Sequence, residues 1–234
     1  MSSPRRRRGS TPRAESPHWP AERAADRARA LALTPVSRET ADRLDRFVEL
    51  LLDWQTRINL IANSTVPVIW TRHVADSLQL ALLAPAARIW VDLGSGGGFP
   101  GLVIACALAD VPGARVHLIE RSAKKAAFLR EAVKATGAPA IVHAMRVGDF
   151  VKNPPESIEI VTARALAPLV ELLAEAYPLL KRGAEGLFPK GQDVGAELTE
   201  ATKRWSIEAA LVPSRTDPNG RIVRVTRIEP IKTT

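Results

Sequence analysis

Hydrophobic positions repeat differently in the first and the later part of the chain. From Ser37 to about Arg57 they recur every three or four positions, at Leu44, Phe47, Val48, Leu51, Trp54 and Ile58. This spacing predicts an amphipathic helix that covers a core. A second helix is expected from about Val68 to Leu83. Residues 31–86 are therefore predicted to form a helical extension in front of the remaining chain.

After Arg88, short apolar runs alternate with helical patterns. Strands are predicted over 89–93, 115–120, 140–145, 159–162 and 185–188, and helices over 102–109, 123–136, 169–181 and 196–205. Such alternation predicts an α/β fold with a mostly parallel, doubly wound sheet and helices on both faces. Strand-like runs over 207–212 and 221–228 flank the turn-rich segment 216–220, which predicts a closing antiparallel hairpin.

The first 30 residues differ from the rest in charge. They carry eight arginines and three carboxylates, more than half of the net charge of +8 in this 234-residue chain. Residues 2–20 contain little that can be buried, so a disordered basic tail over 1–30 is expected. The tail lacks the apolar stretch of a signal peptide, and no apolar run approaches the roughly 20 residues that span a membrane. With only one cysteine, Cys106, a cytoplasmic protein without disulfides or a membrane partner is expected.

The most informative segment is the glycine-rich stretch Val91-Asp-Leu-Gly-Ser-Gly-Gly-Gly-Phe-Pro-Gly101. An apolar strand leads into the turn and a helix follows directly, an arrangement typical of nucleotide-like cofactor sites. A dinucleotide-binding turn, G-x-G-x-x-G from Gly94, needs a glycine where Phe99 stands. The spacing matches better the D-x-G-x-G-x-G turn of S-adenosylmethionine-dependent methyltransferases. A turn that serves only strand-to-helix geometry is the alternative.

Each later strand also ends in a candidate ligand-binding residue. In a doubly wound sheet, ligands bind across the carboxyl ends of the central strands. Glu120 ends the second strand, and its carboxylate can accept both ribose hydroxyls of either NAD or S-adenosylmethionine. Residues 146–149 follow the third strand, where their backbone can pair with an adenine edge. Arg164 and Lys190 follow the fourth and fifth strands, with a salt-bridged surface position as the alternative for Arg164.

Taken together and in this order, the motifs resemble the RsmG family, also called GidB. The resemblance covers about residues 40–228 and rests on Arg72-His73-Val-Ala-Asp76-Ser77, the glycine turn, Glu120-Arg-Ser122 with Lys124-Lys125 and Phe128-Leu129, Thr162-Ala-Arg-Ala165 and Lys190-Gly191. It implies a class I methyltransferase core over residues 87–234. It also implies methyl transfer from S-adenosylmethionine to N7 of a guanine in bacterial 16S ribosomal RNA.

The turn, the strand ends and the resemblance together define the candidate site residues. The cofactor candidates are Asp92, Gly94, Ser95, Gly96, Gly98, Phe99, Glu120, Val147, Gly148 and Arg164. The candidates for positioning the substrate are Arg72, His73, Arg164 and Lys190. One position departs from the family, which usually has Glu where Gly148 stands. A backbone contact survives that change, whereas a side-chain role would have to pass to Asp149.

Guanine N7 as the target agrees with the chemistry that the residues offer. N7 presents a lone pair, so no general base is expected and alignment should supply most of the acceleration. Methylation of a cytosine ring carbon generally needs a cysteine nucleophile, and Cys106 falls within a helix instead. The tetrapeptide Asn153-Pro-Pro-Glu156 resembles the motif used on exocyclic amines, but it precedes the fourth strand and lacks a terminal aromatic ring, so a simple turn is expected.

The expected partner is 16S ribosomal RNA or the small ribosomal subunit, and a monomer without a metal is expected. RNA contacts are predicted at Arg72, Lys124, Lys125, Arg164 and Lys190, where Arg72 would contact a phosphate or the O6/N7 edge of guanine. A helix-packing role for Arg72 and His73 is the alternative. Two other functions are kept as alternatives, an NAD-dependent oxidoreductase and a noncatalytic, cofactor-sensing RNA-binding module.

Overall fold

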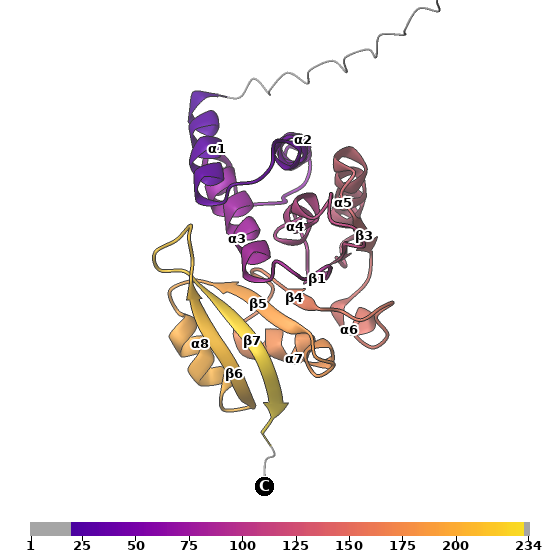
Figure 1. The fold of residues 1–234 in the computed structure, drawn as a ribbon, viewed down its shortest axis with the longest axis vertical. Helices are drawn as coiled ribbons and strands as arrows, with labels where there is room; N and C mark the ends of the chain where they lie inside the picture. The colour runs from indigo at the N-terminus through magenta and orange to yellow at the C-terminus, as the bar shows by residue number, and fades with distance from the viewer. Residues whose placement is uncertain (1–19, 232–234) are drawn as a thin grey trace, which may run out of the picture.

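A seven-stranded sheet forms the centre of the molecule in a computed structural model that describes residues 20–231. Its strand order is β3-β2-β1-β4-β5-β7-β6 (Figure 1). The strands are β1 (Ile89–Leu93), β2 (Arg115–Ile119), β3 (Ala140–His143), β4 (Ile160–Thr162), β5 (Glu185–Lys190), β6 (Trp205–Pro213) and β7 (Arg221–Pro230). The first five pair in parallel, whereas β7 runs antiparallel to both β5 and β6. The predicted parallel sheet with a closing hairpin is confirmed.

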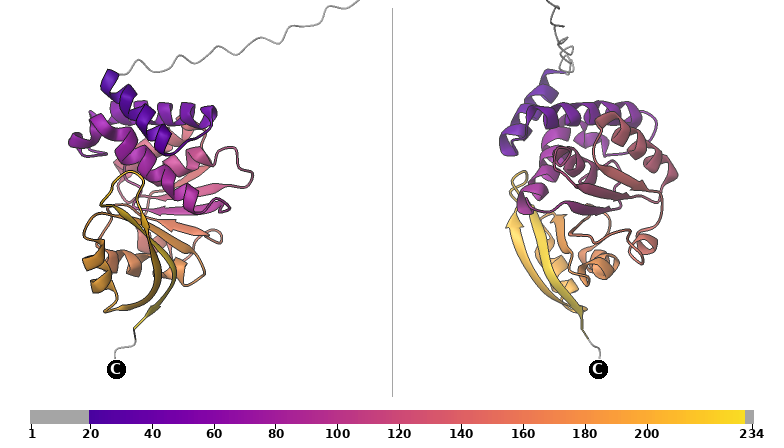
Figure 2. Two further views of the ribbon diagram at one scale, coloured as in Figure 1. Left: turned by 60° about the vertical axis from the view of Figure 1, so that its left-hand side comes forward. Right: turned by 45° about the vertical axis from the view of Figure 1, so that its right-hand side comes forward.

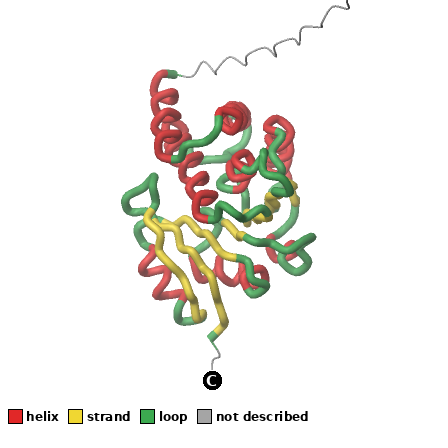
Figure 3. The backbone as a smooth tube through the Cα atoms, viewed as in Figure 1, coloured by secondary structure: helices red, strands yellow, loops and turns green. Residues whose placement is uncertain are grey.

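Helices cover both faces of this sheet, as Figures 2 and 3 show. On one face lie α2 (Arg38–Gln55), α3 (Asp76–Leu83), α4 (Gly101–Ala107) and α5 (Ala123–Thr136). On the other lie α6 (Val147–Phe150), α7 (Leu169–Leu180) and α8 (Val194–Ala201). Each layer has its own buried apolar core.

The continuous apolar runs of the strands follow from this double coverage. Along β1, Trp90 is buried in the core beneath α2–α5, while Val91 is buried in the core beneath α6–α8. Successive strand residues point to opposite faces, so a strand covered on both sides needs apolar residues throughout. β6, at the edge of the sheet, is mostly exposed.

The expected disorder over residues 1–30 is wrong for residues 21–30, and residues 1–19 lie outside the described part. The helix α1 (Ala21–Leu33) packs against the turn η2 (Trp70–Ala75). Asp26 is fully buried and accepts hydrogen bonds from the Trp70 and Thr71 amides, at 2.9 and 3.2 Å. A buried carboxylate that satisfies the first N–H groups of a helical turn stabilises both elements. From composition alone, Asp26 was counted only as one of the three carboxylates in the basic tail.

The helix predicted from Val68 to Leu83 is divided into three parts. A 3₁₀ segment, η1 (Asn63–Val68), is followed by the π-helical turn η2 and then by α3. The wider π turn changes which side chains face inward, and π turns often occur at functional sites. Arg72 is consequently exposed while His73 is buried.

Candidate active site

The carboxyl ends of β1 and β4 lie side by side and create the candidate site. These two strands are neighbours in the sheet. On one side of them the chain continues from β1 to β2 and β3, and on the other side it continues from β4 to β5. That topological switch point is where open α/β sheets bind ligands. A cleft of about 660 Å³ lies there, lined by Gly94, Gly96, Ile119, Glu120, Arg121, Lys125, Met145, Arg146, Val147, Gly148, Asp149, Lys152, Ala165, Leu166 and Glu175. We call it the glycine-turn cleft, and its volume is typical of small-ligand sites.

Glu120 and the glycine turn are joined by direct hydrogen bonds. One carboxylate oxygen of Glu120 accepts from the Gly96 amide at 2.9 Å, and the other accepts from the Ser122 amide at 2.7 Å. Each oxygen keeps a second lone pair. Gly94 and Gly96 have φ of 73° and 53°, the left-handed region that favours glycine. The predicted carboxylate and two of the predicted glycines therefore line one cleft.

The other predicted glycine, Gly98, faces the helical extension instead. A Cβ at Gly98 would lie 3.0 Å from the Phe47 ring in α2, and one at Gly97 would lie 3.0 Å from the Leu60 carbonyl oxygen. Gly98 does not line the glycine-turn cleft. The four glycines thus serve two purposes, since two open the cleft and two let the N-terminal helices approach the turn.

Asp92 and Ser95 lie beneath the turn and do not line the cleft. Asp92 is buried, with 1% of its surface exposed. Its carboxylate accepts hydrogen bonds from the Gly101 amide (3.1 Å) and the Thr162 hydroxyl (3.2 Å). Burial raises the pKa of Asp92 to about 6, against the lowering effect of its hydrogen bonds. The Ser95 hydroxyl donates to the Asp92 carbonyl at 3.1 Å. Both residues fix the turn to β1, β4 and α4, so their contribution to ligand binding is indirect.

Val147 and Gly148 lie in the first turn of α6 and line the cleft as expected. The amides of a first helical turn have no partner inside the helix, so they are available to a ligand. A Cβ at Gly148 would meet nothing within 4 Å. The space at this position can therefore hold a larger side chain, such as the Glu that the family usually has. Asp149 lines the same cleft.

Phe99, His73 and Arg164 form a stack between the glycine turn and η2. The His73 ring lies on Phe99 with centroids 4.9 Å apart, and the Arg164 guanidinium carbon is 5.2 Å from the Phe99 centroid. Phe99 is 5% and His73 8% exposed, and neither lines the cleft. Both rings therefore pack around Arg164, while cofactor contact for Phe99 and substrate positioning for His73 stay predictions.

Hydrogen bonds determine the proton position on His73. The Thr65 hydroxyl donates to the Ala62 carbonyl, so it accepts from His73 Nε2 at 2.8 Å. Arg164 can only donate, so His73 Nδ1 accepts from its guanidinium. Burial, with the nearby Arg164 and Arg72 charges, lowers the pKa of His73 to about 3. The imidazole is neutral and holds Arg164 in place.

Because His73 is held neutral, we expect it to destabilise the protein in acid. The unfolded chain takes up a proton near pH 6.5 and the folded chain near 3, so the stabilisation is full above 6.5 and is lost as pH falls. At pH 5 the loss is about 2 kcal/mol. The stability advantage of the native chain over His73→Asn should shrink by this amount between pH 7.5 and 5, measured by urea unfolding.

A comparison with the variant is needed because Asp92 acts in the opposite direction. Its folded pKa of about 6 exceeds its ordinary value of 3.8, so its protonation adds stability as pH falls through that window. The variant retains Asp92, and the difference isolates His73. A difference independent of pH, or a His73 imidazole NMR signal that titrates near 6.5, would contradict the assignment.

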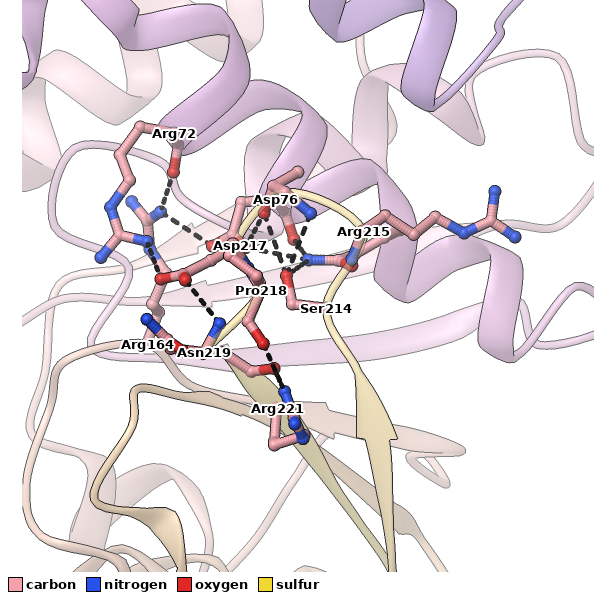
Figure 4. A network of polar contacts seen from close by, with 12 residues as sticks. Arg72, Asp76, Arg164, Ser214, Arg215, Asp217, Pro218, Asn219 and Arg221 are labelled. Carbon is pink, nitrogen blue, oxygen red and sulfur yellow. Dashed lines mark hydrogen bonds and ion pairs between the residues drawn. The ribbon is translucent and has the colours of Figure 1, made fainter.

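A second hollow, of about 170 Å³, lies beside the first. Its lining includes Arg72, Asp76, Gln79, Arg164, Ala165, Pro189, Lys190, Gly191, Ser214, Asp217, Gly220, Arg221 and Ile222. We call it the arginine hollow. Figure 4 shows how α3 and the β6–β7 loop bring most of its charged groups together. Three of the four predicted positioning residues line it, while His73 lies behind Arg164.

The arginine hollow contains two cations that are firmly held by neighbours. The Lys190 ammonium donates to Glu197 at 2.7 Å and to the Ala167 carbonyl at 3.0 Å. Arg164 donates to the Arg72 carbonyl at 3.1 Å and pairs with Asp76 at 3.4 Å. Both side chains tie the segment after β4 to neighbouring elements, so they order this wall of the site.

Ala165 is shared by the lining of both hollows. Its φ is 52°, a conformation that costs free energy for a residue with a side chain. The neighbouring Leu166 would be 2.6 Å from a Cβ at Gly94, so the glycine turn and this segment are in close contact. A ligand in the cleft and one in the arginine hollow would meet at Ala165.

Sequence reasoning missed the contribution of the β6–β7 loop. Residues 216–220 were recognised only as a turn, yet Asp217 and Gly220 line the arginine hollow together with Arg221 at the start of β7. The start of this loop is bonded to Asp76 and Gln79 in α3, which lie 135 to 140 positions earlier, and no local pattern reports such contacts. The segment Asn153-Pro-Pro-Glu156 forms a turn, as expected, and none of its four residues lines either hollow.

Between residues 20 and 231 no helix is long and apolar enough to cross a membrane. The same residues include no group of three or more His, Cys, Asp or Glu side chains placed to hold a metal ion.

Sequence comparisons identify a matching family and similar proteins. The family model for rRNA small subunit methyltransferase G matches residues 40–218. A Bradyrhizobium protein named ribosomal RNA small subunit methyltransferase G is 65% identical over 206 residues, covering 88% of this chain and 93% of its own length. A protein of the same name from Nitrobacter hamburgensis is also 65% identical over 206 residues, covering 88% of this chain and 79% of its own.

Solved structures show the same fold at low sequence identity. An O-methyltransferase from Bacillus cereus, in complex with SAH, has a TM-score of 0.58 at 16% identity, covering 87% of this chain and 97% of its own. The O-methyltransferase TomG from Streptomyces achromogenes, in complex with SAM, has a TM-score of 0.56 at 14% identity, covering 87% and 96%. The expected class I methyltransferase fold is confirmed.

Proposed function

Because the chain belongs to the rRNA small subunit methyltransferase G family, we propose that it transfers a methyl group from S-adenosylmethionine to N7 of a guanine in 16S ribosomal RNA. The observation that carries this proposal is the meeting of the glycine-turn cleft and the arginine hollow at Ala165. One hollow suits the donor, and the other, rich in guanidinium groups, suits RNA. The family makes an oxidoreductase or a noncatalytic module the weaker interpretation.

The glycine-turn cleft fits S-adenosylmethionine in size and in polar groups. Glu120 is held by two backbone amides with a lone pair left on each oxygen, so it can accept both ribose hydroxyls. Gly94 and Gly96 allow close approach of the backbone. The amides of Val147 and Gly148 are proposed to meet the adenine edge, and Asp149 is near enough to assist. When bound, the cofactor supplies an electrophilic methyl group on sulfur.

The chain's own residues contribute alignment more than acid–base chemistry. Neutral guanine N7 presents a lone pair, so the residues need only orient the base and exclude water. Arg164 fixes the wall between the two hollows through Asp76, His73 and the Arg72 carbonyl. Arg72 is free to reach the RNA, because its side chain is 53% exposed. We propose a cytoplasmic monomer that acts on 16S ribosomal RNA or the small subunit.

Methylation of 16S ribosomal RNA from a strain that lacks this modification tests the proposal. The purified protein and labelled S-adenosylmethionine should yield one 7-methylguanosine per RNA molecule, detected by nuclease digestion and mass spectrometry. Naked RNA and small subunits are assayed in parallel to identify the preferred substrate. Label on another atom, or binding of NADH but not of S-adenosylhomocysteine in calorimetry, would contradict the proposal.

A further inference from the structure

Within residues 20–231, two of the four cations that line the arginine hollow have no carboxylate within hydrogen-bonding distance. Arg164 and Lys190 are paired with Asp76 and Glu197. Arg221 donates to the Pro218 and Gly220 carbonyls, at 2.9 and 2.7 Å. Within residues 20–231, no carboxylate lies within ion-pair distance of Arg221. Its charge is therefore uncompensated in a half-buried position.

Arg72 is the second such cation, and within residues 20–231 the one carboxylate within ion-pair distance of it, Asp217, is held loosely. Its Nη1 lies 3.8 Å from the Asp217 carboxylate, beyond hydrogen-bonding distance. The two side chains are 53% and 35% exposed, so water screens the pair. Arg72 is thus positioned near an anion without a hydrogen bond to it.

The β6–β7 loop holds Asp217 at this place. The Arg215 amide donates to Gln79 at 2.8 Å, and the Thr216 hydroxyl donates to Asp76 at 2.9 Å. The Asp217 carboxylate itself accepts from the Asn219 amide at 2.9 Å. In Figure 4 this loop lies against α3, and Asp217 points toward Arg72. Residues on both sides of Asp217 are anchored, while its carboxylate has only one hydrogen bond.

We propose that the arginine hollow binds a phosphate of the RNA substrate between Arg72 and Arg221, and that this phosphate displaces Asp217 from Arg72. The inference rests on the proposed function and adds a subsite to it. Guanidinium groups bind phosphate through paired, charge-assisted hydrogen bonds, which the carboxylate at 3.8 Å does not make. Asp217 then acts as a weak internal anion that is exchanged for a stronger one.

The position of the hollow favours RNA over the donor as the source of the anion. Gly94, Gly96 and Glu120 line only the other cleft, and Ala165 is the residue that the two linings share. A phosphate here would place the RNA backbone next to the cleft where the methyl group is delivered. The subsite would therefore position the target nucleotide without contacting the donor.

Binding of 16S ribosomal RNA in the presence of S-adenosylhomocysteine, at several salt concentrations, tests the subsite without requiring catalysis. Arg72→Gln and Arg221→Gln should each weaken binding about tenfold and reduce the slope of log affinity against log salt by about 1. Arg221→Lys retains the positive charge but cannot form the paired hydrogen bonds of a guanidinium, so an RNA affinity between those of the native chain and Arg221→Gln is expected.

Arg215→Gln is the matched control. It removes the same charge from the same loop, but the Arg215 side chain extends away from the hollow (Figure 4), and its backbone contact to Gln79 is retained. Its affinity and salt slope should stay close to those of the native chain. Equal effects of Arg215→Gln, Arg72→Gln and Arg221→Gln would show general attraction only and overturn the proposal.

Asp217→Asn tests the exchange. The amide oxygen can still accept from the Asn219 amide, while the competing charge is removed, so RNA binding should strengthen several-fold. Weaker RNA binding by this variant would overturn the exchange. Calorimetry with S-adenosylhomocysteine should be unchanged in all variants, and a lower affinity in Arg221→Gln would assign the hollow to the donor and overturn the proposal. If the native chain binds RNA but methylates no guanine, the proposed function fails separately.

Discussion

Replacing Arg164 with alanine is expected to reduce methyl transfer at least about 100-fold, because a displacement of about 1 Å can cost that much. The Arg164 guanidinium connects the segment after β4 with η2 and α3 through the Arg72 carbonyl, His73 and Asp76. Without it, Ala165 and Leu166 lose the contacts that fix the wall between the two hollows. The turnover number should fall, while the affinity for S-adenosylhomocysteine changes only a few-fold.

A stability measurement separates this positioning role from general unfolding. Removing the guanidinium leaves the Asp76 carboxylate with its contacts to Gln79 and Thr216, so a cost of about 1–3 kcal/mol is expected. Arg164→Lys retains a positive charge for Asp76 but loses the planar guanidinium that bonds three groups at once. Relative to Arg164→Ala, this variant should therefore regain more of the free energy of unfolding than of the turnover number. Arg204→Ala, which removes an exposed arginine, is the control. Native turnover in Arg164→Ala would show that the side chain is dispensable for alignment.

Glu120→Ala is expected to weaken the binding of S-adenosylhomocysteine about 100-fold or more. The carboxylate is 7% exposed and is already oriented by the Gly96 and Ser122 amides. Two hydrogen bonds from the ribose to a charged acceptor are each worth about 1.5–3 kcal/mol. Losing both corresponds to at least two powers of ten in affinity.

Isothermal calorimetry on a set of variants measures this effect. Glu120→Gln keeps one acceptor oxygen, so its affinity should lie between those of the native chain and Glu120→Ala. Glu175→Ala removes the same charge from the lining of the same cleft, without a contact to the glycine turn, and should lose far less. An unchanged affinity in Glu120→Ala would remove the carboxylate from the donor site.

The residues that line the glycine-turn cleft show which part of the site could be predicted. Glu120 and the segment 146–149 were identified because each lies at the end of a parallel strand, and such strands end at one edge of the sheet. The resemblance to the family then singled out Val147 and Gly148 within that segment. Gly94 and Gly96 were identified because their spacing defines the turn. These inferences needed only the order of elements and the position of residues relative to them.

Residues whose environment depends on distant packing were assigned less well. Phe99 was expected to contact the cofactor and His73 to position the substrate or pack between helices, and the structure stacks the two rings next to Arg164. Gly98 faces Phe47 from α2. Residues 21–30 were counted as a disordered tail, although Asp26 is buried against η2. In each case the deciding partner lies far away in the sequence.

By itself the sequence determined the sheet, its strand ends and the class of ligand that the glycine turn suits, because these depend on periodicity and local backbone geometry. Only the tertiary structure decided which charges remain available. It neutralised Lys190 and Arg164, buried His73, and left Arg72 and Arg221 without close anionic partners beside Asp217. The physical reason is that an ion pair depends on distances between side chains from different elements, which local sequence patterns do not encode.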